Sequence, residues 1–259
     1  MKKVVLMAVA IFAILASSCS NQQRAEAIID DIFTCIAWVE DDEGENVYWC
    51  GARWTGPYGV TVNEQGYFFH RGDQVSKKRA KKLAHQHLKK QVFPFLCHVE
   101  RRLSDDEIIG VCLFIYNVGG EQFSGYNLDG TVARDKRGRI IPPSEFLQAI
   151  NRGDKPEKVV NYMTGFRKSG GRRANGLLKR HWVTGGIYLG KISVNDVKKC
   201  RPKSFYDTHN FGNYYWLDSE RRLIIEDGYY KLRYDKTTMS AFKAMNFAKD
   251  GGRTVASII

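Results

Sequence analysis

The sequence lacks several patterns that would define its class at once. No two cysteines have CxxC spacing, and no cluster of cysteine and histidine has the spacing of metal ligands. There is no internal repeat, which argues against solenoid and propeller architectures. The apolar run at residues 4–15 is only twelve residues long, too short for a permanent membrane-spanning helix. These absences leave an ordinary folded domain as the expectation.

The N-terminus is typical of an exported protein. Lys2 and Lys3 precede the apolar run, and small residues follow it up to Cys19. Residues 15–19, Leu-Ala-Ser-Ser-Cys, resemble a bacterial lipobox, whose cysteine is acylated and becomes the new N-terminus. Ordinary signal cleavage nearby is the alternative. We expect residues 1–19 to be a signal peptide and the protein to be a membrane-anchored lipoprotein facing the periplasm or cell envelope.

The charge balance favours anionic partners. The chain has 40 Lys and Arg against 28 Asp and Glu, a net charge of +12. Without Lys2 and Lys3 the balance is 38 against 28, or +10. In an exported protein this charge suits peptidoglycan and anionic lipid, so we expect no nucleic acid partner. A hydrophobic content of 43% is enough for a sizeable core.

The first part of the chain alternates between helical and β patterns. Apolar spacing predicts a helix over residues 25–39, which ends at an acidic cluster before Gly44. Aromatic and β-branched residues broken by glycines predict a small β lobe over 46–70. Apolar spacing then predicts a long helix over 76–103, kinked or split at Pro94, and a buried helix over 108–118. Ser104-Asp105-Asp106-Glu107 has the pattern of a capping box that starts this buried helix.

The remainder contains a loop insertion and further helices. Residues 125–143 are rich in glycine and charge and predict an insertion. Short helices are predicted over 144–151, 159–166 and 176–181, and β structure beyond about residue 193, with a short helix near 239–248. The whole order predicts an α+β fold, mainly helical, with a cleft between the β lobe and the helices.

Glu40 is the candidate for chemistry. It ends the first predicted helix and precedes the β lobe. Cleavage of a glycosidic bond requires a carboxyl group that protonates the leaving oxygen, and a second group that handles water. A partly buried carboxyl group at a cleft suits the first role. The alternative is that this acidic helix end is simply solvated.

Three segments resemble the phage-type lysozymes and endolysins of glycoside hydrolase family 24. The family has a helix-terminal Glu, then Tyr-x-Asp or Tyr-x-Cys, then Trp-Thr-x-Gly-Tyr-Gly-x-Thr. This chain has Glu40, Tyr48-Trp49-Cys50 and Trp54-Thr55-Gly56-Pro57-Tyr58-Gly59-Val60-Thr61. The second segment, residues 114–123, is similar to a buried Phe-x-Tyr-Asn-x-Gly-x-x-x-Phe helix. The third combines Asn151-Arg152-Gly153 with Gly176-Leu177-Leu178-Lys179-Arg180, similar to Asn-x-Gly and Gly-Leu-x-x-Arg.

The resemblance implies a lysozyme-like fold over residues 24–192 and an enzyme without cofactor or metal. Its catalytic triad maps onto Glu40 as general acid, Cys50 in the second position, and Thr55, which holds the attacking water. The implied reaction is inverting hydrolysis of the β-1,4 bond between N-acetylmuramic acid and N-acetylglucosamine. The implied partners are the glycan strands of peptidoglycan.

The chain also departs from the family pattern. One residue is added between Glu40 and Tyr48, and one is missing between Cys50 and Trp54. A thiol is a poorer base than a carboxylate, so Cys50 either positions the water weakly or forms a disulfide in an oxidising compartment. Glu43 is the rival acid because it precedes a glycine, as the family acid does. Helical spacing favours Glu40, because only Glu40 continues the apolar face of the preceding helix.

Four further residues are candidates for substrate binding. Tyr116, Asn117 and Gln122 belong to the second motif and contact either the glycan or the neighbouring core elements. Tyr58 lines the cleft or packs as a core aromatic residue.

Two other functions compete with a muramidase. A glycan-binding scaffold without catalysis would explain Cys50 and the changed spacings, and a lytic transglycosylase also needs a single Glu. A lipid anchor favours local openings of the wall, for turnover or for an envelope-spanning machine such as a conjugation apparatus. The aromatic-rich extension, residues 193–259, either completes the core or stacks on sugars.

Overall fold

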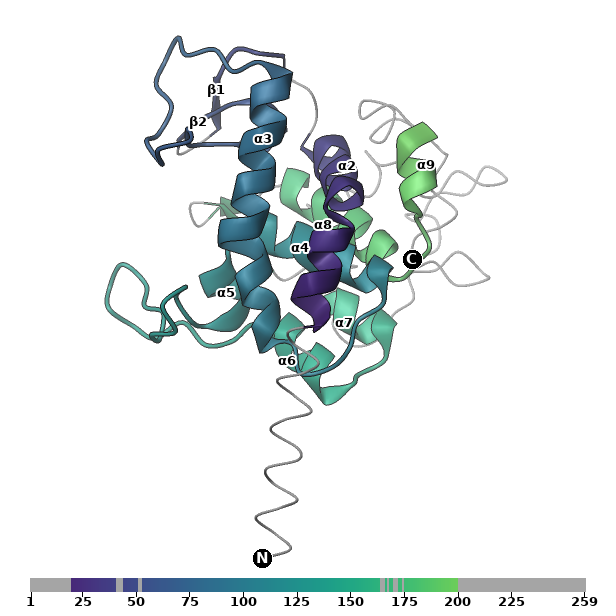
Figure 1. Cartoon of the computed structure of the whole chain (residues 1–259). Coiled ribbons are helices and arrows are strands. Elements are labelled where there is room, and N and C mark those ends of the chain that lie inside the picture. The colour runs from purple at the N-terminus through teal and green to yellow at the C-terminus, as the bar shows by residue number, and fades with distance from the viewer. Residues whose placement is uncertain are drawn as a thin grey trace, which may run out of the picture.

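The computed structural model describes residues 20–40, 44–50, 53–163, 166, 168–169, 172–173 and 175–199. Most of this part of the chain is helical, and a small β lobe lies at one end of the helices (Figure 1). The predicted signal and lipidation site, residues 1–19, and the segment 200–259 lie outside the described residues. None of the helices that the structure describes has the length and apolar character needed to cross a membrane.

The order of elements confirms the predicted α+β class. A helical segment at residues 20–27 comes first. It is followed by α2 (Ile29–Val39), β1 (Tyr48–Cys50), β2 (Arg53–Thr55), α3 (Lys77–His87), α4 (Asp105–Val118), α5 (Gly120–Ser124), α6 (Glu145–Arg152), α7 (Pro156–Met163), β3 (Lys168–Ser169), β4 (Arg172–Arg173), α8 (Asn175–Tyr188) and α9 (Val194–Lys199).

Helix α4 forms the centre of the core, as its apolar sequence predicts. Ser104 and Glu107 form the expected capping box, each side chain accepting from the other residue's backbone N–H. Every residue from Ile108 to Ile115 is buried, and α4 packs most extensively against α8. A helix that is apolar nearly all round can only be stable when other helices surround it, which is the arrangement in Figure 1.

The β lobe is a short hairpin with little core of its own. Strands β1 and β2 are antiparallel, with Trp49 opposite Trp54. Single bridges pair Trp54 with Phe69 and Val62 with Phe68, which extends the hairpin into the following loop. The lobe buries a second, smaller apolar cluster against α2 and α3: Phe33, Val47, Val60, Phe69, Val75, Ala80, Leu83 and Ala84.

Helix α3 connects the β lobe to the helical body (Figure 1). The Ser76 side chain caps its first turn by accepting from the Arg79 N–H (3.3 Å). The helix then changes to a π-helical turn over Leu88–Val92 and to a 3-10 turn over Phe93–His98. Pro94 has no N–H to donate and lies at the start of the 3-10 turn, so the helix is split near Pro94 as predicted, although its regular α-helical part already ends at His87. The expected helix to residue 103 is five residues too long.

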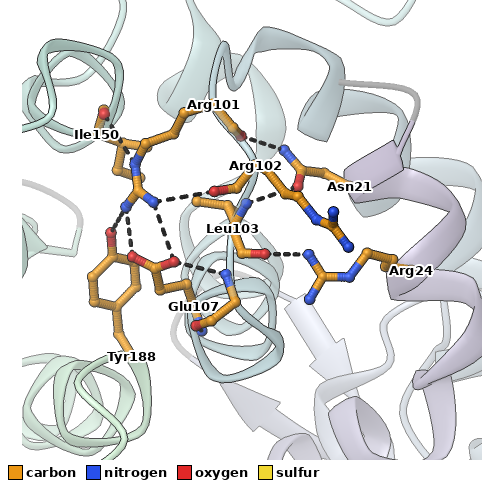
Figure 2. A network of polar contacts seen from close by, with 9 residues as sticks. Asn21, Arg24, Arg101, Arg102, Leu103, Glu107, Ile150 and Tyr188 are labelled. Carbon is orange, nitrogen blue, oxygen red and sulfur yellow. Dashed lines mark hydrogen bonds and ion pairs between the residues drawn. The ribbon is translucent and has the colours of Figure 1, made fainter. Parts of the chain in front are cut away.

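A buried polar network joins the start of the described chain to α4 and α8 (Figure 2). The Asn21 amide donates to the Arg101 carbonyl (2.8 Å) and accepts from the Leu103 N–H (3.0 Å). The Arg101 guanidinium contacts the Glu107 carboxylate (2.5 Å) and the Tyr188 hydroxyl (2.9 Å). Because Asn21 is fully buried and satisfied at both ends, the helical segment at 20–27 belongs to the fold rather than to a linker.

The later elements confirm some expectations and correct others. Residues 125–143 form the predicted insertion, in which Tyr126 pairs with Val132 and Arg134 with Ile140. Helix α8 extends well beyond the predicted 176–181. The prediction of β structure beyond residue 193 is wrong for Val194–Lys199, which form α9. Val197 is buried in the main core, because α9 packs against α2.

Candidate active-site cleft

Glu40 lies at the C-terminal end of α2, and its N–H donates to the Ile36 carbonyl (2.8 Å). Ile36 and Val39 on the same helix are buried in the core, so the end of the helix is held firmly. The Glu40 side chain is 10% exposed. A buried carboxylate requires polar partners in the protein.

Arg180 is the main hydrogen-bond partner of the Glu40 carboxylate. Its Nη2 donates to Oε2 of Glu40 (2.9 Å), and its Nη1 donates to Oδ1 of Asn117 (2.7 Å). The Arg180 guanidinium on α8 therefore joins Glu40 at the end of α2 to Asn117 on α4. No hydrogen bond to the other oxygen, Oε1, occurs among the described residues, so that oxygen is available to a substrate.

Gly59 makes room for the same carboxylate from the lobe side. It has a φ of +75°, and a Cβ atom there would lie 2.9 Å from Cδ and Oε2 of Glu40. The preceding Tyr58 has a φ of 61°, in the left-handed region that non-glycine residues rarely adopt. This tight turn over Pro57–Gly59 brings backbone rather than a side chain against Glu40.

Tyr116 links the turn to the central helix. Its hydroxyl donates to the Tyr58 carbonyl (2.8 Å). Burial, and then the negative charge of Glu40, raises the pKa of Tyr116, so the hydroxyl stays protonated and remains a donor. The His87 ring lies edge-to-face on the Tyr116 ring, at 5.0 Å between centroids. Burial lowers the pKa of His87 to about 4, so this imidazole is neutral near pH 7.

The β hairpin provides the other two residues of the predicted triad. Thr55 is 5% exposed, and its hydroxyl donates to the Arg53 carbonyl (3.3 Å). Cys50, opposite Arg53 in the hairpin, is exposed and has a free thiol. A threonine hydroxyl can both donate to and accept from a water molecule.

These elements enclose a cleft of about 570 Å³ between the lobe and the helices. Its lining includes Glu40, Tyr48, Cys50, Arg53, Thr55, Gly59, Thr61, Val62, His87, Tyr116, Asn117 and Arg180. This volume is typical of sites that bind small molecules or segments of a polymer. Among the described residues that line this cleft, Glu40 is the only carboxylate.

The structure brings together most of the predicted site residues. Glu40, Cys50, Thr55, Tyr116 and Asn117 all line the cleft. The prediction for the rival acid Glu43 lies outside the described residues.

Two predicted binding residues lie elsewhere. Tyr58 packs edge-to-face on Phe33 (5.0 Å between centroids), so its ring belongs to the core of the lobe. Gln122 is exposed on α5 and does not line the cleft. The structure thus places the Tyr58 ring in the core and Gln122 at an exposed position outside the cleft lining.

Sequence reasoning missed two residues of the cleft. It assigned no role to Arg180, although Arg180 ends the Gly-Leu-x-x-Arg segment and pairs with Glu40. It assigned no role to His87 either, although His87 lines the cleft. The motif was the available signal for Arg180. No sequence signal marked His87, because its neighbour Tyr116 is 29 positions away in the chain.

Comparison with known proteins gives the class of this protein. The phage lysozyme family model matches residues 41–182, more than half of the chain, so the chain belongs to the phage lysozyme family. It has the lysozyme-like fold, and membership supports a glycosidase that hydrolyses peptidoglycan. The match begins one residue after Glu40 and so leaves the choice of acid open. No curated protein matches the chain.

Three solved structures are similar to the chain. The endolysin from Escherichia coli O157:H7 phage FAHEc1 is 19% identical, with a TM-score of 0.48, covering 63% of this chain and 93% of the endolysin. The active form of P1 phage endolysin Lyz is 17% identical, with a TM-score of 0.46, covering 60% of this chain and 81% of the endolysin. The muramidase domain of SpmX from Asticaccaulis excentricus is 16% identical, with a TM-score of 0.45, covering 61% of this chain and 94% of that domain.

Proposed function

We propose that this protein is an N-acetylmuramidase that hydrolyses the β-1,4 bond between N-acetylmuramic acid and N-acetylglucosamine, with inversion. The observation that carries the proposal is Glu40, a buried carboxylate in a cleft that Thr55 and Cys50 also line. Family membership supports a peptidoglycan substrate.

In this proposal Glu40 acts as the general acid. Its Oε2 is held by Arg180, which leaves Oε1 as the oxygen that carries the proton and gives it to the leaving glycosidic oxygen. Arg180 and Asn117 act as positioning residues, because they fix the carboxyl group before the substrate binds.

The water molecule is the second part of the reaction. Thr55 holds it by accepting one of its hydrogen bonds, and the water oxygen attacks the anomeric carbon as the glycosidic bond breaks. The water releases its second proton to solvent, and Cys50 helps to position the water from the second position of the triad. The products are a reducing muramic acid end and a free hydroxyl on the leaving sugar.

The test is digestion of purified peptidoglycan by the full-length protein, with mass spectrometry of the fragments. We expect reducing muramic acid ends from the wild type and none from Glu40→Gln, while Glu121→Gln, a change of an exposed carboxylate on α5, remains active. NMR at early times should show the α anomer first, because inversion of a β bond gives it. Equal cleavage by Glu40→Gln would refute the mechanism. Anhydro-muramic ends would show a lytic transglycosylase.

A second candidate function is a peptidoglycan-binding scaffold without catalysis. The exposed free thiol at Cys50, in place of a carboxylate, favours it. In that case intact glycan is recovered from the digestion, while the wild type and Glu40→Gln both co-sediment with the wall.

We further propose that the protein is exported and anchored to the membrane through lipidated Cys19. The signal-like N-terminus and the basic charge support this proposal. A tethered hydrolase is suited to local openings in the wall, including those for an envelope-spanning machine. Incorporation of a labelled fatty acid into the wild type and not into Cys19→Ser tests the anchor, and Cys97→Ser is the control. Equal labelling of both variants would exclude Cys19.

A further inference from the structure

The cleft contains a second cation besides Arg180. Arg53 on β2 lines the cleft, and its guanidinium carbon lies 4.4 Å from the centre of the Phe68 ring. Phe68 is 50% exposed and pairs with Val62, which also lines the cleft. Paired residues of an antiparallel bridge share one face, so the Phe68 ring stands beside Val62 at the rim. Arg53 and Phe68 therefore form a stacked pair at the lobe edge of the cleft.

No carboxylate of the described chain neutralises Arg53. Within that part of the chain, no acidic group lies within 4.0 Å of its guanidinium, and the guanidinium donates no hydrogen bond. Among the described residues that line the cleft, the one carboxylate is Glu40, and it is already paired with Arg180. The forked, positively charged guanidinium group of Arg53 therefore has its N–H donors open to a ligand in the cleft.

The contact with Phe68 prepares this fork for binding. A cation over an aromatic face is attracted by the ring, which holds a long side chain in one place. Less conformational freedom is then lost when a ligand binds. An arginine fork matches a carboxylate with two parallel hydrogen bonds, which neutral sugar hydroxyls do not match in charge.

We propose that Arg53, held on Phe68, binds a carboxylate of the peptide stem that branches from the glycan strand. This inference rests on the proposed function, because it takes peptidoglycan as the substrate. The sugars of that polymer are largely neutral once the lactyl groups are joined to peptides, whereas the stems end in free carboxylates. Arg53 is then a specificity-determining residue that favours glycan with stems over bare glycan. Its place at the exposed edge of the cleft suits a branch that leaves the strand.

The test compares two substrates with the full-length protein: peptidoglycan fragments with their stems, and the same fragments after an amidase has removed the stems. We expect the wild type to prefer the first. In Arg53→Gln the ratio of kcat/KM between the two substrates should fall about tenfold, mostly through KM, as expected for the loss of a charge-assisted pair. Phe68→Leu should lower the same ratio about two- to threefold, because the fork remains but is less ordered.

Arg137→Gln removes an exposed cation from the insertion and should leave the ratio as in the wild type. An unchanged ratio in Arg53→Gln would overturn the inference. This includes the case in which kcat/KM falls by the same factor on both substrates.

A binding measurement separates this inference from the proposed function. Calorimetry with Glu40→Gln and a stem-bearing fragment needs no cleavage. If the wild type cuts neither substrate but Arg53→Gln weakens this binding about tenfold, the muramidase proposal fails and the carboxylate site stands. If cleavage occurs and binding of fragments with and without stems is equally tight, the carboxylate site fails alone.

Discussion

The helical body and the β lobe contribute to the cleft in different ways. Helix α4 buries eight consecutive residues, Ile108 to Ile115, whereas β1 and β2 have three residues each and leave Trp49 56% exposed. The body holds Glu40, together with Arg180 and Asn117, at the edge of a dense core. The lobe presents Thr55, Cys50 and Arg53 on a hairpin with little core beneath it. The lining of the cleft is thus divided between a densely packed region and a lightly packed one.

The largest expected contrast between the regions is in stability. Phe114 in α4 is fully buried, with the Phe146 ring centre at 4.6 Å and the Phe166 ring centre at 5.0 Å. Phe114→Ala should lower the free energy of unfolding by about 3–5 kcal/mol, because it leaves a cavity in the core. Trp49→Ala in the lobe should cost less than about 1 kcal/mol. Urea denaturation measures both, and equal losses would show that the lobe is as well packed as the body.

Acid should destabilise the body through buried His181. Its Nε2 donates to the Phe166 carbonyl (2.9 Å), and burial lowers its pKa to about 4. In the unfolded chain an imidazole binds a proton near pH 6.5. Because the unfolded state then binds a proton that the folded state does not, stability falls as the pH drops from about 6.5 to about 4. The free energy of unfolding falls by about 3 kcal/mol over this pH range.

Unfolding in urea at several pH values measures the slope of the free energy of unfolding against pH. His181→Gln should flatten it, although His87 keeps a contribution of the same sign. His70→Gln, at an exposed position of the lobe, should leave it unchanged. A wild-type stability that is constant between pH 7 and about pH 4 would contradict burial of neutral imidazoles.

A smaller effect is expected where the two regions meet. Gly59→Ala places a methyl group against Glu40 at a φ of +75°, and should cost about 1–2 kcal/mol and most of the activity. Gly66→Ala is a matched control, because Gly66 has a φ of +86° but nothing within 4 Å of the added carbon. It should cost a similar free energy and keep full activity. Equal loss of activity in both variants would mean that backbone strain alone matters.

The smallest effect is expected in the insertion, which belongs to neither region. Leu128 is 47% exposed there, so Leu128→Ser should change the free energy of unfolding by no more than about 0.5 kcal/mol. Leu147→Ser, at a buried position of α6, should cost several times more. Thermal unfolding of the two variants measures the difference. A large effect of Leu128→Ser would show that the insertion packs on the body.

The sequence predicted those features whose cause is local. The buried helix, the capping box at Ser104 and Glu107, and the break at Pro94 all depend on neighbouring residues, and all are confirmed. The prediction of β structure for residues 194–199 failed because α9 is stabilised by burial of Val197 against α2, which is distant in sequence. Packing against a remote partner leaves little trace in a local pattern.

The candidate site shows the same division. Glu40, Thr55 and Cys50 were found from the motif that contains them, whereas the role of Arg180 required the meeting of α2, α4 and α8. Gln122 belongs to the same motif as Asn117 and yet faces solvent, because α4 ends at Val118 and the chain changes direction at Gly119. Membership in a motif does not by itself place a side chain in a cleft.

By itself the sequence determined the central apolar helix, the capping box at its start and the family, because these depend on residue types and their spacing. Only the tertiary structure decided which side chains surround Glu40. Arg180 lies 140 positions away from it, and Gly59 approaches it through the left-handed turn at Tyr58. The same holds for Arg53 on Phe68. Such contacts follow from how the elements pack in space, where distance along the chain no longer matters.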